Sequence, residues 1–106
     1  MKEKIYLSGK ITGDAGYREN FEAGVRHFVD LGWSRKDIVN PVEYCPEGWS
    51  WRRCMWRCVR LLLRCGYVGM LPNWRDSRGA RIEHQIAQLT GKWIVYVGGR
   101  KQKGGA

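Results

Sequence analysis

The sequence lacks several features that would define its class at once. It has no run near the roughly 18 uninterrupted apolar residues of a membrane span, and its first residues, MKEKIYLSG, lack the apolar core of a signal peptide. We therefore expect a soluble, cytoplasmic protein that is not bound to a membrane. Acidic residues are scarce, 10 against 19 Lys and Arg, so the formal net charge is +9. This balance favours an anionic partner, such as a phosphate ligand, a nucleic acid or a membrane surface, without choosing among them.

Closely paired cysteines are missing as well. No C-x-x-C pair occurs, and only Cys54 and Cys58 lie one helical turn apart, with no second close pair to complete a zinc tetrahedron. A chain with six Trp and strongly apolar strand-like runs needs no disulfide staples. We therefore expect no metal site, no cofactor and reduced thiols at Cys45, Cys54, Cys58 and Cys65.

The apolar periodicity indicates short strands that alternate with helices. Parallel neighbours need crossover connections, so this alternation predicts an α/β fold in which a parallel sheet has helices on both faces. Gly32 and Gly91 are well placed to end the first and third helices. The strands are expected near Ile5, Ile38, Tyr67 and Trp93, and the helices around residues 21–29, 51–64 and 79–90.

A length of 106 residues allows one domain, because two would each bury too little surface. We place this domain at residues 1–97. Residues 98–106 contain four glycines, two lysines and an arginine, and no hydrophobe except the final alanine, so they are expected to form a flexible basic tail.

Ligands of parallel sheets bind beyond the carboxyl ends of the strands, which directs attention to three loops: Ser8–Gly13, Asn40–Pro41 and Pro72–Gly79. The first has small residues and Lys10 after a strand, and the third leads into a helix N-terminus, where free N–H groups favour an anion. Neither is a Walker motif or a G-x-G-x-x-G fingerprint. The alternative is that the glycines serve tight turns and that Ser77 only caps a helix.

Glu83 lies four residues beyond Gly79 on the third predicted helix. It is one position away from the apolar stripe of Ile82, Ile86 and Leu89, so it is expected to point beside the core. A helix N-terminus favours the ionised carboxylate, which suits a nucleophile or an electrostatic stabiliser. A solvated surface glutamate is the alternative.

A basic stripe marks the second predicted helix, with Trp51 and Trp56 interleaved as stacking groups for nucleic acid. A solvated helix face is the other interpretation of this stripe. Trp74, in the loop before the third helix, either stacks on a base or caps the sheet edge. The stripe consists of Arg53, Arg57, Arg60 and Arg64.

Three segments carry a resemblance to a known family. They are YLSGKITG at residues 6–13, Asn40–Pro41, and LPNWRDSRGARIE at residues 71–83, with Ala87 and Gly91 following. Together they resemble a family common in phages and prophages, the domain of unknown function 4406. That family is similar in turn to nucleoside 2-deoxyribosyltransferases and to 2′-deoxynucleoside 5′-monophosphate N-glycosidases. The resemblance covers residues 4–97.

The resemblance implies a small flavodoxin-like or Rossmann-like three-layer sandwich with a four-stranded parallel sheet, usually a homodimer with its site near the interface. It implies an enzyme in which Glu83 attacks C1′ of a deoxyribose as the base leaves, so that water gives hydrolysis and a second base gives transfer. The substrate is then a deoxynucleoside or a nucleotide. The expected substrate-binding residues are Ser8, Gly9, Lys10, Ile11, Asn40, Trp74, Ser77, Gly79 and Ala80.

Two departures from the family pattern bear on activity. Relatives carry an aspartate near the start of the central helix and another just before the third strand, where this chain has Cys58 and Gly66. Such acids orient the substrate and handle protons. Their absence leaves a second function open, a non-catalytic protein that binds or sequesters nucleotides, and nucleic-acid binding through the basic helix is a third.

Overall fold

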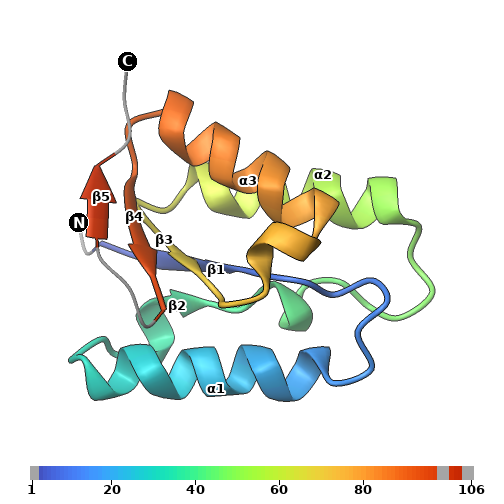
Figure 1. The fold of residues 1–106 in the computed structure, drawn as a ribbon, viewed down its shortest axis with the longest axis horizontal. Helices are drawn as coiled ribbons and strands as arrows, with labels where there is room; N and C mark the ends of the chain where they lie inside the picture. The colour runs from blue at the N-terminus through green and yellow to red at the C-terminus, as the bar shows by residue number, and fades with distance from the viewer. Residues whose placement is uncertain (1–2, 98–100, 104–106) are drawn as a thin grey trace.

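The computed structural model describes residues 3–97 and 101–103 as one α/β unit (Figure 1). Its helices and strands alternate as the periodicity predicts. The elements are β1 (Ile5–Ser8), α1 (Tyr17–Asp30), η1 (Arg35–Asp37), β2 (Ile38–Val39), η2 (Pro41–Glu43), α2 (Trp51–Leu63), β3 (Tyr67–Met70), η3 (Trp74–Asp76), α3 (Arg78–Leu89), β4 (Trp93–Tyr96) and β5 (Lys101–Lys103).

The sheet has the order β2-β1-β3-β4-β5, and the first four of these strands pair in parallel. The predicted strand positions and parallel pairing are therefore confirmed. The expectation of a flexible tail is wrong for Lys101–Lys103, because these residues pair antiparallel with β4. Backbone pairing at an open sheet edge needs no hydrophobic side chains, so composition did not reveal this strand. The rest of the predicted tail lies outside the described residues.

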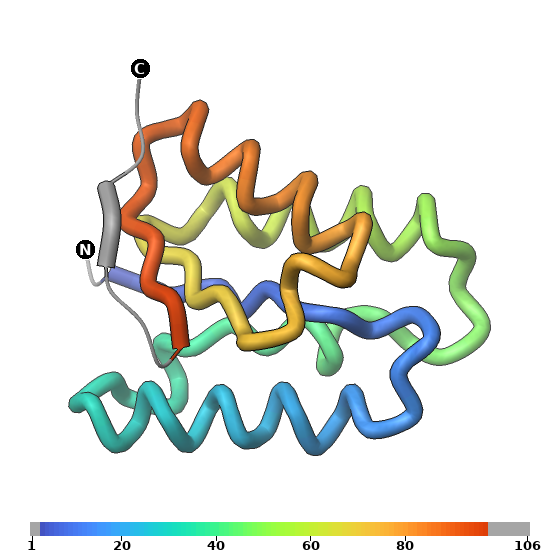
Figure 2. Tube along the Cα trace, in the orientation of Figure 1, coloured from blue at the N-terminus to red at the C-terminus, as the bar shows by residue number. Residues whose placement is uncertain are grey.

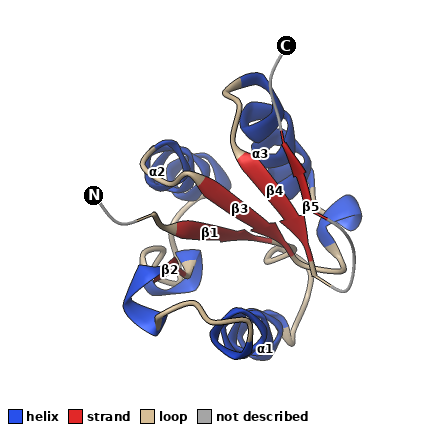
Figure 3. Cartoon of the chain, turned by 90° about the vertical axis from the view of Figure 1, so that its left-hand side faces the viewer, coloured by secondary structure: helices blue, strands red, loops and turns tan. Residues whose placement is uncertain are grey.

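Helices cover both faces of the sheet, as Figure 3 shows, with α1 on one face and α2 and α3 on the other. The strand residues alternate between the two faces because successive side chains of a strand point in opposite directions. Ile5 and Leu7 of β1 pack with Phe28 of α1, whereas Tyr6 packs with α2 and α3. This alternation also turns Ser8 toward α3.

The face of α3 that meets the sheet differs from the predicted one. Its buried residues are Gly79, Ala80, Glu83 and Ala87, whereas Leu89 is 76% exposed. Small side chains let the helix lie close to the sheet. The apolar stripe is displaced to the flank of the helix, and Glu83 faces inward.

The chain path brings the loop after β1 and the loop before α2 to the same end of the molecule (Figure 2). Gly32 and Gly91 have φ of 111° and 73° just beyond α1 and α3, as expected for helix terminators. Within residues 3–97 and 101–103, no helix has the length and apolar character to cross a membrane.

Candidate functional site

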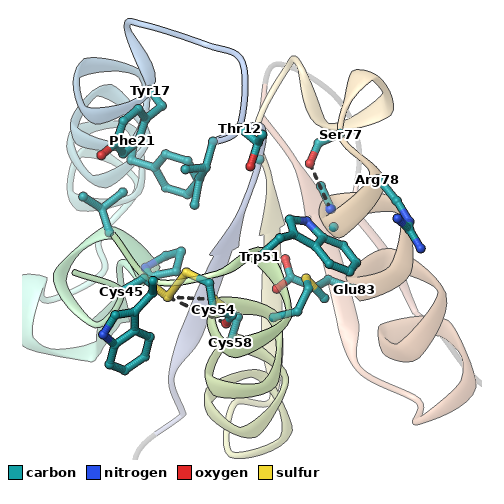
Figure 4. A pocket seen from close by; sticks show the side chains of 18 of the residues that line it. Thr12, Tyr17, Phe21, Cys45, Trp51, Cys54, Cys58, Ser77, Arg78 and Glu83 are labelled. Carbon is teal, nitrogen blue, oxygen red and sulfur yellow. Dashed lines mark hydrogen bonds between the residues drawn. A yellow bond between two sulfur atoms is a disulfide. The ribbon is translucent and has the colours of Figure 1, made fainter. Parts of the chain in front are cut away.

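A cavity of about 610 Å³ opens beyond the carboxyl end of β1. Its walls come from the loop after β1, the start of α1, the segment that leads from β2 into α2, the first turns of α2 and the N-terminus of α3. Figure 4 shows Tyr17 and Phe21 on one side and Ser77 and Arg78 on the other. The volume is in the range of small-molecule sites.

Glu83 lines this cavity and is only 5% exposed. The Tyr6 hydroxyl donates to its Oε2 at 2.8 Å, and the Ser8 hydroxyl donates to its Oε1 at 2.7 Å. Tyr6 and Ser8 are two residues apart on β1, so they share the sheet face that meets α3. The alternative of a solvated surface glutamate is therefore wrong. Both oxygens of the carboxyl group are held in place.

Burial controls the acidity of this group. It raises the pKa of Glu83 from 4.5 to about 7, against the hydrogen bonds from Ser8 and Tyr6, which lower it. The expectation that the ionised carboxylate is favoured, based on the helix N-terminus, therefore needs correction. Near neutral pH the group is shared between the two protonation states. A carboxyl group poised in this way can exchange a proton or act as a nucleophile.

The N-terminus of α3 forms another part of the wall. The Ser77 Oγ accepts a hydrogen bond from the Ala80 N–H at 3.1 Å, which caps the helix. Gly79 lies close to α2, since a Cβ there would come within 2.9 Å of the Met55 sulfur. The Arg78 guanidinium lies 4.5 Å from the centre of a Trp51 ring. Backbone N–H groups and a guanidinium together suit an anionic group such as phosphate.

The structure brings most of the predicted site residues together. Ser8 does not line the cavity, but its hydroxyl group holds the Glu83 carboxyl group through a hydrogen bond. The predicted residues that line it are Gly9, Ile11, Ser77, Gly79, Ala80 and Glu83.

Besides Ser8, three predicted residues lie outside the cavity lining. The backbone N–H of Lys10 donates to the Asn73 side chain at 3.2 Å. The Asn40 side chain accepts from the Val42 N–H at 3.1 Å and so caps η2, a structural task. The third residue, Trp74, packs against other aromatic rings.

Trp74 stacks on the His84 ring with 4.2 Å between centroids. The His84 Nε2 lies 2.6 Å from the Tyr96 hydroxyl of β4. This favours the interpretation that Trp74 closes the sheet edge. Desolvation and the Arg75 charge lower the pKa of His84, which favours its neutral form.

Several lining residues were not anticipated from the sequence. Tyr6 is fully buried, and desolvation and the Glu83 charge raise its pKa well above the ordinary value, so it remains a hydroxyl donor. Its i, i+2 spacing from Ser8 was the available sequence signal, because residues at this spacing in a strand lie on the same face of the sheet. Tyr17, Trp49 and Trp51 also line the cavity, and they offer flat surfaces on which a base can stack. Tyr6, Tyr17 and the neighbouring pair Trp49 and Trp51 come from three separate segments, so no local pattern linked them.

The cysteines differ most from expectation. Cys45 and Cys54 form a disulfide, so the prediction that all four thiols are reduced is wrong for this pair. The loop after η2 folds back onto the first turn of α2 and brings the two Cα atoms to 5.6 Å, within the range of a disulfide. Cys58 and Cys65 are free and buried. Burial, and then the Glu83 charge, raise the pKa of Cys58 to about 11.

The two positions at which the resemblance implies aspartates lie in different places. Cys58 lines the cavity, and its pKa is raised by burial and by the Glu83 charge. Gly66 precedes β3, at the opposite end of the strand, where a Cβ would collide with the Glu3 carboxylate. Only the Cys58 position bears directly on the cavity.

These features define an α/β protein whose sheet has four parallel strands, with a cavity of small-molecule size that is lined by a buried glutamate beyond the carboxyl ends of the strands. The family model described as Domain of unknown function (DUF4406) matches residues 3–96, and the chain belongs to this family. No curated protein and no solved structure matches the chain.

Proposed function

We propose that this protein cleaves the N-glycosidic bond of a deoxynucleoside or its 5′-monophosphate, with Glu83 as the nucleophile. The observation that carries the proposal is the buried Glu83 carboxyl group, which lines the cavity while Tyr6 and Ser8 fix both of its oxygens. A fixed carboxylate has its attacking orbital in place before the substrate arrives, which removes part of the entropic barrier.

The chemistry follows the retaining route of glycoside hydrolysis. A Glu83 oxygen forms a bond to C1′ while the bond from C1′ to the base nitrogen breaks, and the base leaves with the bonding electron pair and takes a proton from solvent. Water then attacks C1′ and loses a proton to solvent as the bond from C1′ to Glu83 breaks, which releases the sugar and restores the carboxylate. If a second base attacks C1′ in place of water, the result is transfer. A phosphate on O5′ would bind at the α3 N-terminus, where Ser77, Arg78 and Gly79 line the cavity and where a helix has unpaired N–H groups.

The pH dependence follows from the Glu83 pKa of about 7. Only the ionised carboxylate attacks, so base release should rise with pH through about 7 and then level off. A rate that instead falls over this window would make Glu83 a general acid and overturn its role as nucleophile.

The decisive experiment incubates the protein with a panel of deoxynucleosides and their monophosphates and measures free base by chromatography. Glu83→Gln keeps the shape of the side chain but removes the nucleophile, so base release should cease. Glu19→Gln is the matched control, because Glu19 is an exposed residue of α1 outside the cavity, and its rate should equal that of the parent. Mass spectrometry of acid-quenched reactions should find deoxyribose attached to the peptide that contains Glu83. Full activity in Glu83→Gln would refute the proposal.

A second candidate function is nucleotide binding without turnover. The observation in its favour is Cys58, which lies in the cavity wall where the resemblance implies an aspartate. Its thiol has a pKa of about 11, so it gives up a proton far less readily than a carboxyl group does. The leaving base then lacks a nearby acid at this position. Calorimetric binding of a deoxynucleotide with no base released over long incubation would select this function.

A further inference from the structure

Three sulfur atoms meet in the cavity wall from two segments of the chain. Cys45 comes from the loop after η2, and Cys54 and Cys58 come from successive turns of α2. The ligand atoms of all three lie within 4.8 Å of one another, and all three residues line the cavity. Figure 4 shows them converging below Phe21 and beside Trp51.

The spacing of these sulfurs fits a zinc ion. In a tetrahedral site with Zn–S bonds of about 2.3 Å, neighbouring sulfurs are about 3.8 Å apart. The Cys45 and Cys58 sulfurs are 3.7 Å apart, which is already the ligand spacing. Cys54 is bonded to Cys45 in the disulfide form. Once that bond opens, the two sulfurs need to separate by only about 1.7 Å to reach the same spacing.

We propose that the reduced chain binds one Zn²⁺ through Cys45, Cys54 and Cys58, with the fourth coordination position open to the cavity. Three protein ligands and one open position are typical of zinc sites that accept water or a ligand atom. The site requires neither catalysis nor a nucleotide, so it is independent of the proposed function. The Cys45–Cys54 disulfide and the zinc complex exclude each other, because the disulfide uses two of the three sulfurs.

The conversion between the two forms balances as follows. A dithiol reductant supplies two electrons and two protons, the Cys45–Cys54 bond breaks into two thiols, and the reductant becomes its own disulfide. Zn²⁺ then displaces the protons of the three thiols, which pass to solvent. Zinc affinity should therefore increase with pH and disappear on oxidation.

Zinc binding is tested on the full chain, reduced under anaerobic conditions and competed against a chromophoric chelator. The reduced parent should take up one Zn²⁺ per chain, and the oxidised parent should take up none. Cys58→Ser should weaken the affinity at least about tenfold, since it removes a direct ligand. Cys65→Ser is the matched control, because Cys65 is a buried free cysteine outside the cavity lining, and it should bind as the parent does.

Co²⁺ added to the reduced parent gives a readout that needs no variant. Thiolate coordination should produce an intense near-ultraviolet charge-transfer band together with the visible bands of a tetrahedral ion. The proposal is overturned if this band is missing, if the reduced parent leaves zinc with the chelator, or if Cys65→Ser loses as much affinity as Cys58→Ser. Base release plays no part in these measurements, so their failure leaves the proposed glycosidic chemistry standing.

Discussion

Glu83 is the residue whose protonation links the fold to pH. Its pKa is about 7 in the folded chain against 4.5 ordinarily, so the folded state holds this proton more tightly than the unfolded state. The resulting stabilisation is fully present below about 4.5 and is lost as the pH rises through about 7. Its size is roughly 3 kcal/mol for a shift of this extent.

Urea unfolding of the parent and of Glu83→Gln checks this dependence. Between about pH 5 and about pH 8 the free energy of unfolding of the parent should fall by up to roughly 3 kcal/mol more than that of the variant, because glutamine cannot titrate. Contributions of all other groups cancel in the difference. Equal pH profiles for the two proteins would mean that Glu83 ionises normally in the folded state.

Cys58 is the residue at which the proposed activity can be tested by restoring an acid. Cys58→Asp would place a second carboxyl group near Glu83, and two such groups cannot both ionise easily, so one stays protonated and can donate to the leaving base. We expect base release to rise by up to about 10²–10⁴-fold, the usual contribution of a general acid. The assay includes a metal chelator, and thermal melts exclude an unfolded variant.

Cys58→Asn serves as the control for this change, since it has the same size without a titratable proton and should leave the rate low. Gly66→Asp should give no gain, because Gly66 precedes β3, at the strand end opposite the cavity. A rate equally high in the Asn and Asp variants of Cys58 would contradict proton donation from this position.

At the scale of elements, the contact of α1 with the sheet depends on Gly69 of β3. A Cβ at this position would lie 2.6 Å from the Phe28 ring and 3.2 Å from a Leu7 methyl group. An aromatic ring packed between helix and sheet cannot move aside without displacing its neighbours. Gly69→Ala should therefore destabilise the fold by about 1–3 kcal/mol or more.

The unfolding free energy in urea measures this effect. Gly16→Ala is the control, because a Cβ there would meet only the Asp14 carboxylate, at 3.7 Å. It should cost no more than the roughly 1 kcal/mol of a less favourable helix cap. A Gly69→Ala chain as stable as the parent would show that α1 can shift away from the sheet at little cost.

At the scale of the whole molecule, the net charge of +9 raises the question of which anion binds. The arginines of the basic stripe on α2 are exposed, and Arg53 lies 4.1 Å from the centre of a Trp49 ring at the cavity. A single nucleotide phosphate releases few counterions, whereas a duplex that engages several arginines releases many. Deoxynucleotide affinity should therefore fall less with added salt than any affinity for a short duplex.

Titrations with a deoxynucleotide and with a short duplex, each at two salt concentrations, show which of the two anions the protein binds. Tight duplex binding with a steep salt dependence, and no nucleotide binding, would favour nucleic-acid recognition through the basic stripe. The homodimer implied by the resemblance remains a prediction, which sedimentation analysis of the same samples checks.

The sequence by itself determined the succession of strands and helices along the chain and the parallel pairing of the first four strands. Apolar runs such as Tyr67–Met70 mark the strands, helical spacing marks the crossovers between them, and Gly32 and Gly91 mark where helices end. These signals are local, since each depends on residues within a few positions of one another. The segment Lys101–Lys103 shows the limit of this reasoning, because strand pairing there depends on the exposed edge of β4 and not on its own composition.

Only the tertiary structure decided which residues line the cavity and how they interact. Glu83 meets Tyr6 and Ser8 across separations of 77 and 75 residues, and its burial depends on how closely the small residues of α3 let that helix approach the sheet. The meeting of Cys45 with Cys58 likewise depends on the path of a loop. Periodicity identifies the apolar positions of a helix, but the packing of distant elements selects the face that is buried, and with it the acidity and chemistry of the residues on that face.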